Sequence, residues 1–199
     1  MDTIRVAVLM ANGTEEVEAL SVVDVLRRGG VEVTIVSIQD KELTTSHGVK
    51  IIADDVLENI RFNEFDGVVI PGGVQGAQSL RDNPKVIEFI KDRNAEKKLC
   101  AAMCAGPIVL AKADIIKGKS LTTYPHENFS SPVKESGAVY SESIVEVDGN
   151  IVTARGPAIS LYFGLQILET LCGKEKRDEV ANAMLIPLLE KAIKASANE

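Results

Sequence analysis

Short apolar runs recur along the chain and alternate with segments in which apolar positions follow a helical period. The runs at residues 5–10, 31–38, 67–70 and 99–103 have the length and apolar character of buried strands. Helical segments lie between several of them. This alternation predicts an α/β protein whose central sheet is mostly parallel.

Helices are expected on the two sides of these strands. The first is predicted over residues 14–28, with Asn12 as its cap and Gly29 and Gly30 as its stop. A second helix should follow residues 82–84. Two more, over residues 160–172 and 175–195, should close the chain. The last carries an apolar patch formed by Val180, Ala183, Met184, Leu185, Leu188 and Leu189.

Two hairpins are expected beside the parallel strands. Residues 43–47 and 49–53 flank Gly48 and predict a small hairpin outside the main sheet. Residues 143–147 and 151–154 flank an Asp-Gly-Asn turn at 148–150, which is a strong hairpin signal. The sheet should therefore be parallel with antiparallel additions.

The composition is that of one globular domain spanning residues 1–199, with 45% hydrophobic and 26% charged residues. A net charge of −7 argues against nucleic acid as the primary partner. No segment is long and apolar enough to span a membrane. Three cysteines form no regular disulfide framework, which favours a reducing, cytoplasmic location. The two histidines lack zinc-ligand spacing, so neither a metal nor a cofactor is predicted.

Cys104 is the strongest candidate for chemistry. It directly follows the strand at residues 99–103 and precedes Gly106 and Pro107, a sequence typical of a sharp turn from a strand into a helix. A helix N-terminus pointing at the sulfur would favour the thiolate. The alternative is a small buried cysteine that packs behind the sheet.

Glu18 is an unexpected carboxylate on the apolar face of the first predicted helix. It shares that face with Ala19, Val22 and Leu26, because their spacings match the helical repeat. The helix dipole explains acidic residues in a first turn, such as Glu15 and Glu16, but explains Glu18 poorly. Burial should favour its neutral form, so it could donate a hydrogen bond to a thiolate or act as an acid–base group.

Gly72 and Gly73 follow Pro71 at the end of the strand over residues 67–70. Their N–H groups would lie at the carboxyl edge of the sheet, where open α/β folds place their sites. A glycine pair at this position is also compatible with a simple tight turn. Beside the turn at Cys104, it becomes a candidate oxyanion hole.

Four further residues have open roles. His126 could reach the sulfur as a base, or could be a solvated loop residue. Arg155 offers a cation for a substrate carboxylate, with a surface ion pair as the alternative. His47, between Ser46 and Gly48, reads mainly as a turn residue. Cys100 is either a resolving thiol or, more simply, a buried residue of the sheet.

Five motifs, in the same order and at compatible spacings, resemble the Parkinson-associated deglycase (DJ-one) branch of the ThiJ/PfpI superfamily. They lie at residues 15–18, 24–28, 71–73, 101–107 and 155–157, and the resemblance covers nearly the whole chain. It implies a flavodoxin-like three-layer sandwich and a homodimer. It also implies that Cys104 is a reactive thiol, that Glu18 is its protonated partner, and that Gly73 and Ala105 supply backbone donors.

The resemblance implies a cysteine-dependent, glutathione-independent glyoxalase or deglycase. Its substrates would be small dicarbonyls such as methylglyoxal, and early glyoxal adducts on proteins or nucleotides. The second hypothesis is a redox-sensing stress protein or holdase in which Cys104 is oxidised to a sulfinate. A hydrolase that transfers acyl or amido groups on the same fold is a third.

One position departs from the family pattern. Where members of this branch commonly have histidine in a Thr-Thr-His-Pro sequence, this chain has Tyr124, and His126 comes two residues later. Tyr124 or His126 would then assist proton transfer. The peptidase branch places histidine directly after the cysteine; here that residue is Ala105, so proteolysis is disfavoured.

Overall fold

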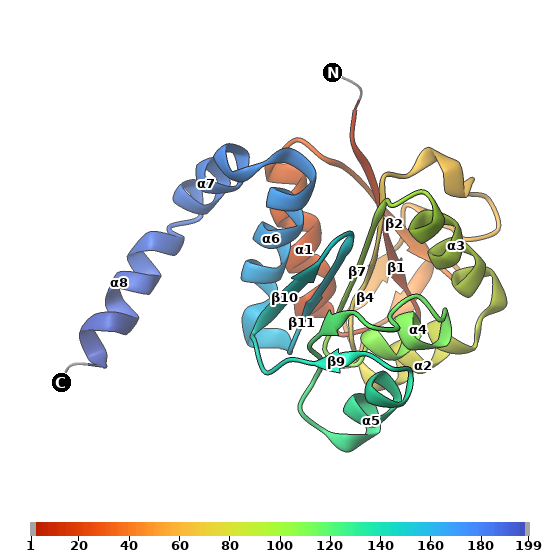
Figure 1. The fold of residues 1–199 in the computed structure, drawn as a ribbon. Helices are drawn as coiled ribbons and strands as arrows, with labels where there is room; N and C mark the ends of the chain where they lie inside the picture. The colour runs from red at the N-terminus through yellow and green to blue at the C-terminus, as the bar shows by residue number, and fades with distance from the viewer. Residues whose placement is uncertain (1–2, 198–199) are drawn as a thin grey trace.

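A central seven-stranded sheet organises the computed structural model, which describes residues 3–197 (Figure 1). Its strand order is β10-β11-β7-β6-β1-β2-β5. The strands are β1 (Arg5–Met10), β2 (Glu32–Ser37), β5 (Asp55–Val56), β6 (Gly67–Ile70), β7 (Leu99–Met103), β10 (Val145–Asp148) and β11 (Ile151–Ala154). Neighbouring strands are parallel except β10 and β11, which form the expected hairpin. The prediction of a mostly parallel sheet is confirmed.

Helices cover both faces of the sheet (Figure 1). They are α1 (Glu16–Arg28), α2 (Val74–Asp82), α3 (Pro84–Ala95), α4 (Pro107–Lys112), α5 (Glu127–Glu135), α6 (Ser160–Cys172), α7 (Lys174–Ala183) and α8 (Ile186–Ser196), with short 3-10 turns at Phe62–Glu64 and Pro157–Ile159. Helices α1 and α6 pack on one face, and α2 to α5 on the other. The result is a three-layer α/β sandwich.

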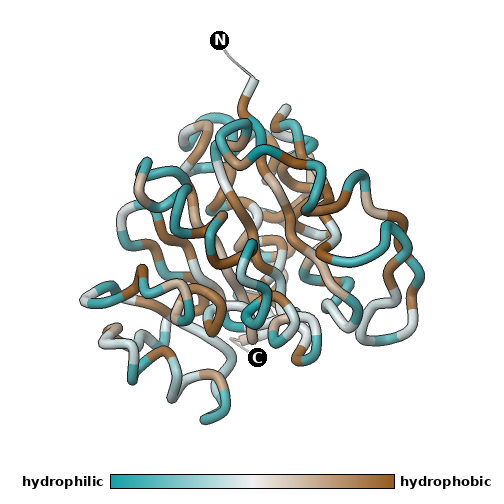
Figure 2. The backbone as a smooth tube through the Cα atoms, turned by 90° about the vertical axis from the view of Figure 1, so that its right-hand side faces the viewer, coloured by the Kyte–Doolittle hydropathy of each residue, from teal (hydrophilic) through white to brown (hydrophobic). Residues whose placement is uncertain are grey.

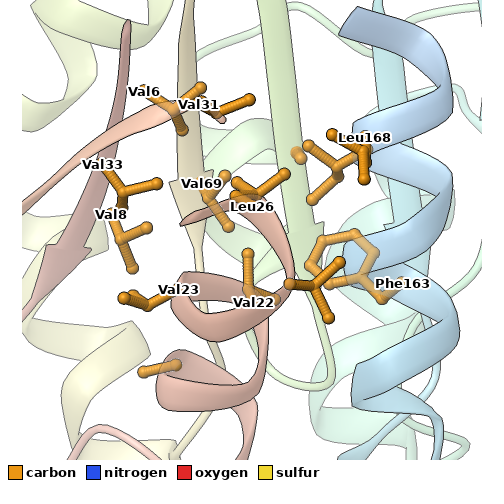
Figure 3. Packing of buried hydrophobic residues seen from close by; sticks show 14 of the residues in the cluster. Val6, Val8, Val22, Val23, Leu26, Val31, Val33, Val69, Phe163 and Leu168 are labelled. Atoms are coloured by element: carbon orange, nitrogen blue, oxygen red, sulfur yellow. The ribbon is translucent and has the colours of Figure 1, made fainter. Parts of the chain in front are cut away.

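The core is divided by the sheet into two apolar layers because alternate side chains of a strand point to opposite faces. Val6 and Val8 of β1 face α1 and α6, whereas Ala7 and Leu9 face the opposite helices. Figure 3 shows the first layer, in which Phe163 of α6 lies beside the α1 side chains. In Figure 2 the hydrophobic stretches concentrate inside the molecule and the hydrophilic ones follow its outer turns.

Two small sheets lie outside the main one. Strands β3 (Glu42–Thr44) and β4 (Lys50–Ile52) form the antiparallel hairpin expected around Gly48. Strands β8 (Ser120–Leu121) and β9 (Val139–Tyr140) pair in parallel. The β3–β4 hairpin is tied to the loop before α1 by a hydrogen bond from Gly13 N to Thr44 O (2.8 Å) and one from Ser46 N to Thr14 O (2.9 Å). This anchoring brings the hairpin tip to the start of α1.

The start of α1 differs from the sequence prediction. Glu15 is the N-cap residue, and Asn12 is not a cap: its Oδ1 accepts a hydrogen bond from Thr44 N at 2.8 Å. Asn12 therefore holds the β3–β4 hairpin, a partner that lies far away in sequence. The predicted end of the helix is confirmed, since Gly29 is the C-cap and Gly30 follows with a φ of +81°.

The prediction of one continuous helix over residues 175–195 is wrong. The chain forms α7 and α8 instead, and Leu185 between them has a left-handed φ of +61°. Pro187 explains the break, because in a continuous helix it would have no N–H to donate to the Ala183 carbonyl and its ring would clash with that carbonyl. Helix α8 extends away from the sheet (Figure 1), and Ile186 is its one buried residue.

Helix α2, which begins directly after Gly73, was not predicted from the sequence. Its mixed polar and apolar sequence and its internal Gly76 do not predict a helix. Gly76 is nevertheless required, because a Cβ added there would lie 2.7 Å from Thr14 N. None of the helices in residues 3–197 combines the length and the apolar character needed to cross a bilayer.

Candidate active site

The Cys104 turn lies at the carboxyl edge of the sheet, directly after β7. Cys104 has a φ of +56°, a left-handed conformation that is strained for a residue with a side chain. Gly106 caps α4, and an added Cβ there would lie 2.6 Å from Ile70 O. The glycine therefore lets the chain turn closely over the end of β6, and the turn presents the sulfur above the sheet.

Hydrogen bonds from neighbouring segments hold this strained turn in place. The N–H of Cys104 donates to Ala154 O at 2.9 Å. Its carbonyl accepts from Tyr124 N at 3.0 Å and from the Thr123 hydroxyl at 2.6 Å. Such support is needed because a non-glycine residue in this conformation costs about 1–3 kcal/mol. The backbone on both sides of the sulfur is thus fixed before any ligand binds.

Glu18 reaches the same place from α1. Its side chain is fully buried, and its Oε2 accepts a hydrogen bond from Gly72 N at 2.6 Å. The carboxyl also lies beside the Cys104 thiol, and each of the two groups shifts the pKa of the other. Its second oxygen, Oε1, has no hydrogen-bond partner among residues 3–197. The structure therefore brings together the two residues singled out first from the sequence.

The glycine pair after β6 leaves room for this contact. An added Cβ at Gly72 would lie 2.4 Å from Glu18 Oε2, 2.6 Å from Cys104 Cβ and 3.0 Å from Cys104 Sγ. At Gly73, whose φ is +86°, it would lie 2.2 Å from Gly13 O. Gly72 O in turn accepts from Glu15 N at 3.1 Å. Side chains are excluded at both positions by the close approach of α1 and the Cys104 turn.

The ionisation of Glu18 and Cys104 is coupled. Burial raises the pKa of Glu18 to about 7, although hydrogen bonds from Cys104 and Gly72 lower it. Burial likewise raises the pKa of the Cys104 thiol, and the charge of Glu18 raises it further, while the N–H groups of Ala105 and Gly73 lower it. Burial thus shifts Glu18 toward its neutral form, the direction expected from the sequence.

The thiolate expected at Cys104 stays a prediction, because opposed effects act on the sulfur. Burial opposes ionisation of both groups, and a charge on one opposes a charge on the other, so the carboxyl and the thiol titrate as a coupled pair. The two backbone N–H groups that lower the pKa of Cys104 are those proposed from the sequence as an oxyanion hole. Both point at the sulfur.

A cavity of about 350 Å³ opens above the sulfur. Its lining includes Glu18, Gly73, Cys104, Ala105 and Tyr124, all named from the sequence, together with Glu15, Ser46, His47, Val74, Phe129 and Pro157. The Tyr124 ring packs edge-on against Phe129, with centroids 6.1 Å apart. The cavity thus combines a thiol, a buried carboxyl and backbone donors with an aromatic wall.

Three residues proposed for the site, Gly72, His126 and Arg155, do not line the cavity, although the Gly72 N–H donates to Glu18. His126 is the N-cap of α5, and its Nδ1 accepts a hydrogen bond from Asn128 N at 3.2 Å. Arg155 donates to Glu142 O at 2.8 Å and to the Tyr140 hydroxyl at 3.3 Å. Their side chains are thus engaged in holding loops. Cys100 is fully buried, with its pKa raised by burial to about 12, and all three cysteines are free thiols.

The sequence predicted His47 mainly as a turn residue, but the structure places it at the cavity. His47 Nδ1 lies 3.4 Å from Glu15 Oε2, 3.3 Å from Glu16 Oε1 and 3.0 Å from Ser46 Oγ. These are also the residues in which two carboxylates and an imidazole come close enough to share a cation. Hydrogen bonds within the cluster account for its arrangement without one. No local signal could have placed His47 here, because the hairpin anchoring does so.

A larger hollow of about 610 Å³ lies at the opposite, amino-terminal edge of the sheet. Lys97, Lys98 and Lys119 contribute to its lining, but Lys98 pairs with Asp66 at 2.7 Å and Lys119 with Asp148 at 2.9 Å. Its lining holds no cysteine and no fully buried carboxyl. We therefore place the candidate active site in the smaller cavity at Cys104.

Comparison with known proteins gives a consistent result. A family model described as the DJ-1/PfpI family matches residues 4–170. The Parkinson disease protein 7 homolog of Danio rerio is 39% identical over 184 residues, covering 92% of this chain and 97% of that protein. Protein DJ-1 homolog A of Arabidopsis thaliana is 37% identical over 92% of this chain, which spans only 47% of the plant protein.

Solved structures show the same fold. The crystal structure of Drosophila melanogaster DJ-1beta superposes with a TM-score of 0.86 at 36% identity, covering 92% of this chain and 98% of that one. A structure described as Toxoplasma gondii DJ-1, oxidized, gives a TM-score of 0.85 at 34% identity, with coverage of 92% and 98%. The expected flavodoxin-like sandwich is confirmed by this likeness.

Proposed function

Because the chain belongs to the DJ-1/PfpI family, we propose that it is a cysteine-dependent, glutathione-independent glyoxalase that acts on methylglyoxal and related dicarbonyls. Membership supports a DJ-1-like, stress-related function. The glyoxalase proposal is supported by one arrangement: the fully buried Glu18 carboxyl lies beside the Cys104 thiol in a cavity. Two backbone N–H groups face the sulfur.

The first step is addition of Cys104 to the aldehyde carbon. As the C–S bond forms, the thiol proton passes to the Glu18 carboxylate and the carbonyl electrons move to oxygen. The N–H groups of Gly73 and Ala105 point at the sulfur, so an oxygen on the attached carbon lies within their reach and its charge is stabilised. Glu18 then returns the proton to that oxygen and leaves a hemithioacetal.

The second step is an internal redox exchange between adjacent carbons. Glu18 removes the hydrogen of the former aldehyde carbon as a proton, which gives an enediol, and delivers a proton to the neighbouring carbon. The first carbon is oxidised to a thioester and the second is reduced to an alcohol, while a hydroxyl proton passes between the oxygens. A pKa of about 7 suits a group that must both accept and donate a proton near neutral pH.

Hydrolysis of the thioester would release lactate and restore the thiol. No external electron acceptor is required, and no cofactor enters these steps. Early glyoxal adducts on amines or thiols are reversible, so removal of free aldehyde would also reverse them. We therefore treat deglycation as a consequence of dicarbonyl consumption.

Turnover without glutathione is the direct test. Wild type, Cys104→Ser and Glu18→Gln proteins are assayed for D,L-lactate formed from methylglyoxal. We expect turnover in wild type and losses of at least about 100-fold in each variant, the range for loss of an acid–base or nucleophilic group. Absence of lactate with folded wild-type protein would overturn the proposal.

A redox-sensing stress protein is the second candidate. The same N–H groups that face the sulfur would donate hydrogen bonds to sulfinate oxygens, and a solved structure of similar fold is described as "oxidized". Under this reading, peroxide adds two oxygen atoms at Cys104 and dicarbonyl turnover is absent. Mass spectrometry of peroxide-treated protein, run beside the lactate assay, separates the two functions.

A homodimer remains part of the proposal. Helix α8 and the Leu185 that precedes it expose an apolar row in which Leu185, Leu188 and Ile193 are 62%, 60% and 58% exposed. An amphipathic helix of this kind is stabilised when its apolar side is covered. The family resemblance and this exposed row support association of two copies.

A further inference from the structure

His47 occupies the outer part of the cavity above Cys104. It lines the cavity together with Glu15 and Ser46, while its side chain is 69% exposed to solvent. Glu18, in contrast, is fully buried on the inner side. The cavity therefore has one acid–base group that faces the interior and another that faces water.

The contacts of the His47 ring assign roles to its two nitrogens. The polar contacts of the ring with residues 3–197 are made through Nδ1, to Ser46, Glu15 and Glu16. Carboxylates only accept hydrogen bonds, so the two that lie beside Nδ1 favour the tautomer with the hydrogen on Nδ1. Nε2 then holds the free lone pair, as in histidines whose other nitrogen donates to a carboxylate.

We propose that His47 is the acid–base residue that activates water for hydrolysis of the Cys104 thioester. This inference rests on the proposed glyoxalase function and assigns its last step. Water must enter from solvent, and Glu18 is screened from solvent by burial. His47 stands where water reaches the cavity, with its orientation fixed by two carboxylates and a hydroxyl.

The step balances without another reactant. The water oxygen attacks the thioester carbon while Nε2 takes one water proton, and the carbonyl electrons move to oxygen. When the tetrahedral intermediate collapses, the C–S bond breaks and its electrons leave on sulfur. The imidazolium returns its proton to the sulfur, the product carboxylic acid loses its remaining proton to solvent, and Glu15 and Glu16 stabilise the transient positive charge.

Single-turnover mass spectrometry tests this assignment. Wild type, His47→Ala and His126→Ala proteins are mixed with methylglyoxal, quenched over time and examined for a lactoyl group on Cys104. We expect His47→Ala to form the adduct at the wild-type rate but to hydrolyse it about 100-fold more slowly, so that the adduct accumulates. Added imidazole should restore much of the hydrolysis, which a folding defect would not allow.

Two controls make the result decisive. Lys50→Ala changes the same hairpin at an exposed residue paired with Glu42, and we expect wild-type turnover from it. Accumulation in His126→Ala but not in His47→Ala would assign the base to His126 and overturn the inference. If wild type is active and His47→Ala hydrolyses the adduct at the wild-type rate, the role of His47 is overturned and the glyoxalase proposal stands. If wild type is inactive, both proposals are overturned.

Discussion

The Glu18 carboxyl and the Cys104 thiol meet across Gly72, although they come from α1 and from the turn after β7. A Cβ at Gly72 would lie 2.4 Å from Glu18 Oε2 and 3.0 Å from Cys104 Sγ, so the two side chains flank a space that only glycine leaves open. The sheet order places β1 and β7 on the two sides of β6, and the Gly72 turn follows β6. This adjacency is the basis of the site.

Gly72→Ala should disrupt that contact. The added methyl group would overlap Glu18 Oε2 and Cys104 Cβ, and the surrounding backbone is fixed by hydrogen bonds, so relief requires moving one of the two side chains. We expect a loss of about 1–3 kcal/mol in the free energy of unfolding, measured with urea, and more than tenfold lower lactate formation.

Gly156→Ala is the matched control for this substitution. Its nearest neighbour would be Tyr124 Cδ2 at 3.4 Å, the edge of a side chain that can shift, and its backbone is extended. We expect a change in unfolding free energy below about 0.5 kcal/mol. Equal effects from both alanines would contradict the steric argument at Gly72.

Glu18→Gln should change how stability depends on pH. In the folded protein burial raises the pKa of Glu18 from 4.5 to about 7, so between these values the native state binds more protons than the unfolded state. Stability from this group is therefore complete below pH 4.5 and is lost as pH rises to about 7, by on the order of 3 kcal/mol. Glutamine does not ionise, so the variant should gain stability relative to wild type as pH rises from 5 to 8, as measured by urea unfolding. Parallel curves for the two proteins would refute the assignment.

The same variant should make Cys104 more reactive toward an alkylating reagent. The charge of Glu18 raises the pKa of the thiol, whereas a glutamine at this position is neutral and leaves the Ala105 and Gly73 donors in place. At pH 8 we expect iodoacetamide to modify Cys104 several-fold faster in Glu18→Gln than in wild type, read by peptide mass spectrometry. Cys100 serves as an internal control, because it is fully buried. A tenfold slower reaction would show that Glu18 holds the proton and stabilises a thiolate.

Sedimentation velocity should give a homodimer of this chain, at twice the monomer mass of 21.4 kDa. The apolar row on α8 would otherwise remain in water, and burial of each such side chain contributes roughly 1.5–3 kcal/mol. We expect the dimer at micromolar concentration and a shift toward monomer on dilution. Monomer at every concentration, with the chain folded, would exclude the homodimer.

The central strands and most of the helices were predictable because their causes are local. Apolar runs defined β1, β6 and β7 to the residue, and Gly29 and Gly30 marked the end of α1. The break at Pro187 was also encoded locally and was overlooked. The start of α1 was not encoded in this way, because Asn12 finds its partner in the hairpin at Thr44.

Sequence alone determined which side chains were unusual: a cysteine at a strand-to-helix turn and a glutamate on an apolar helix face. Only the tertiary structure decided which groups surround them. It placed His47 at the cavity and left His126 and Arg155 outside it, since these positions depend on contacts between distant segments. It also decided which groups act on the Cys104 thiol through space: burial and the charge of Glu18 raise its pKa, and the backbone donors lower it.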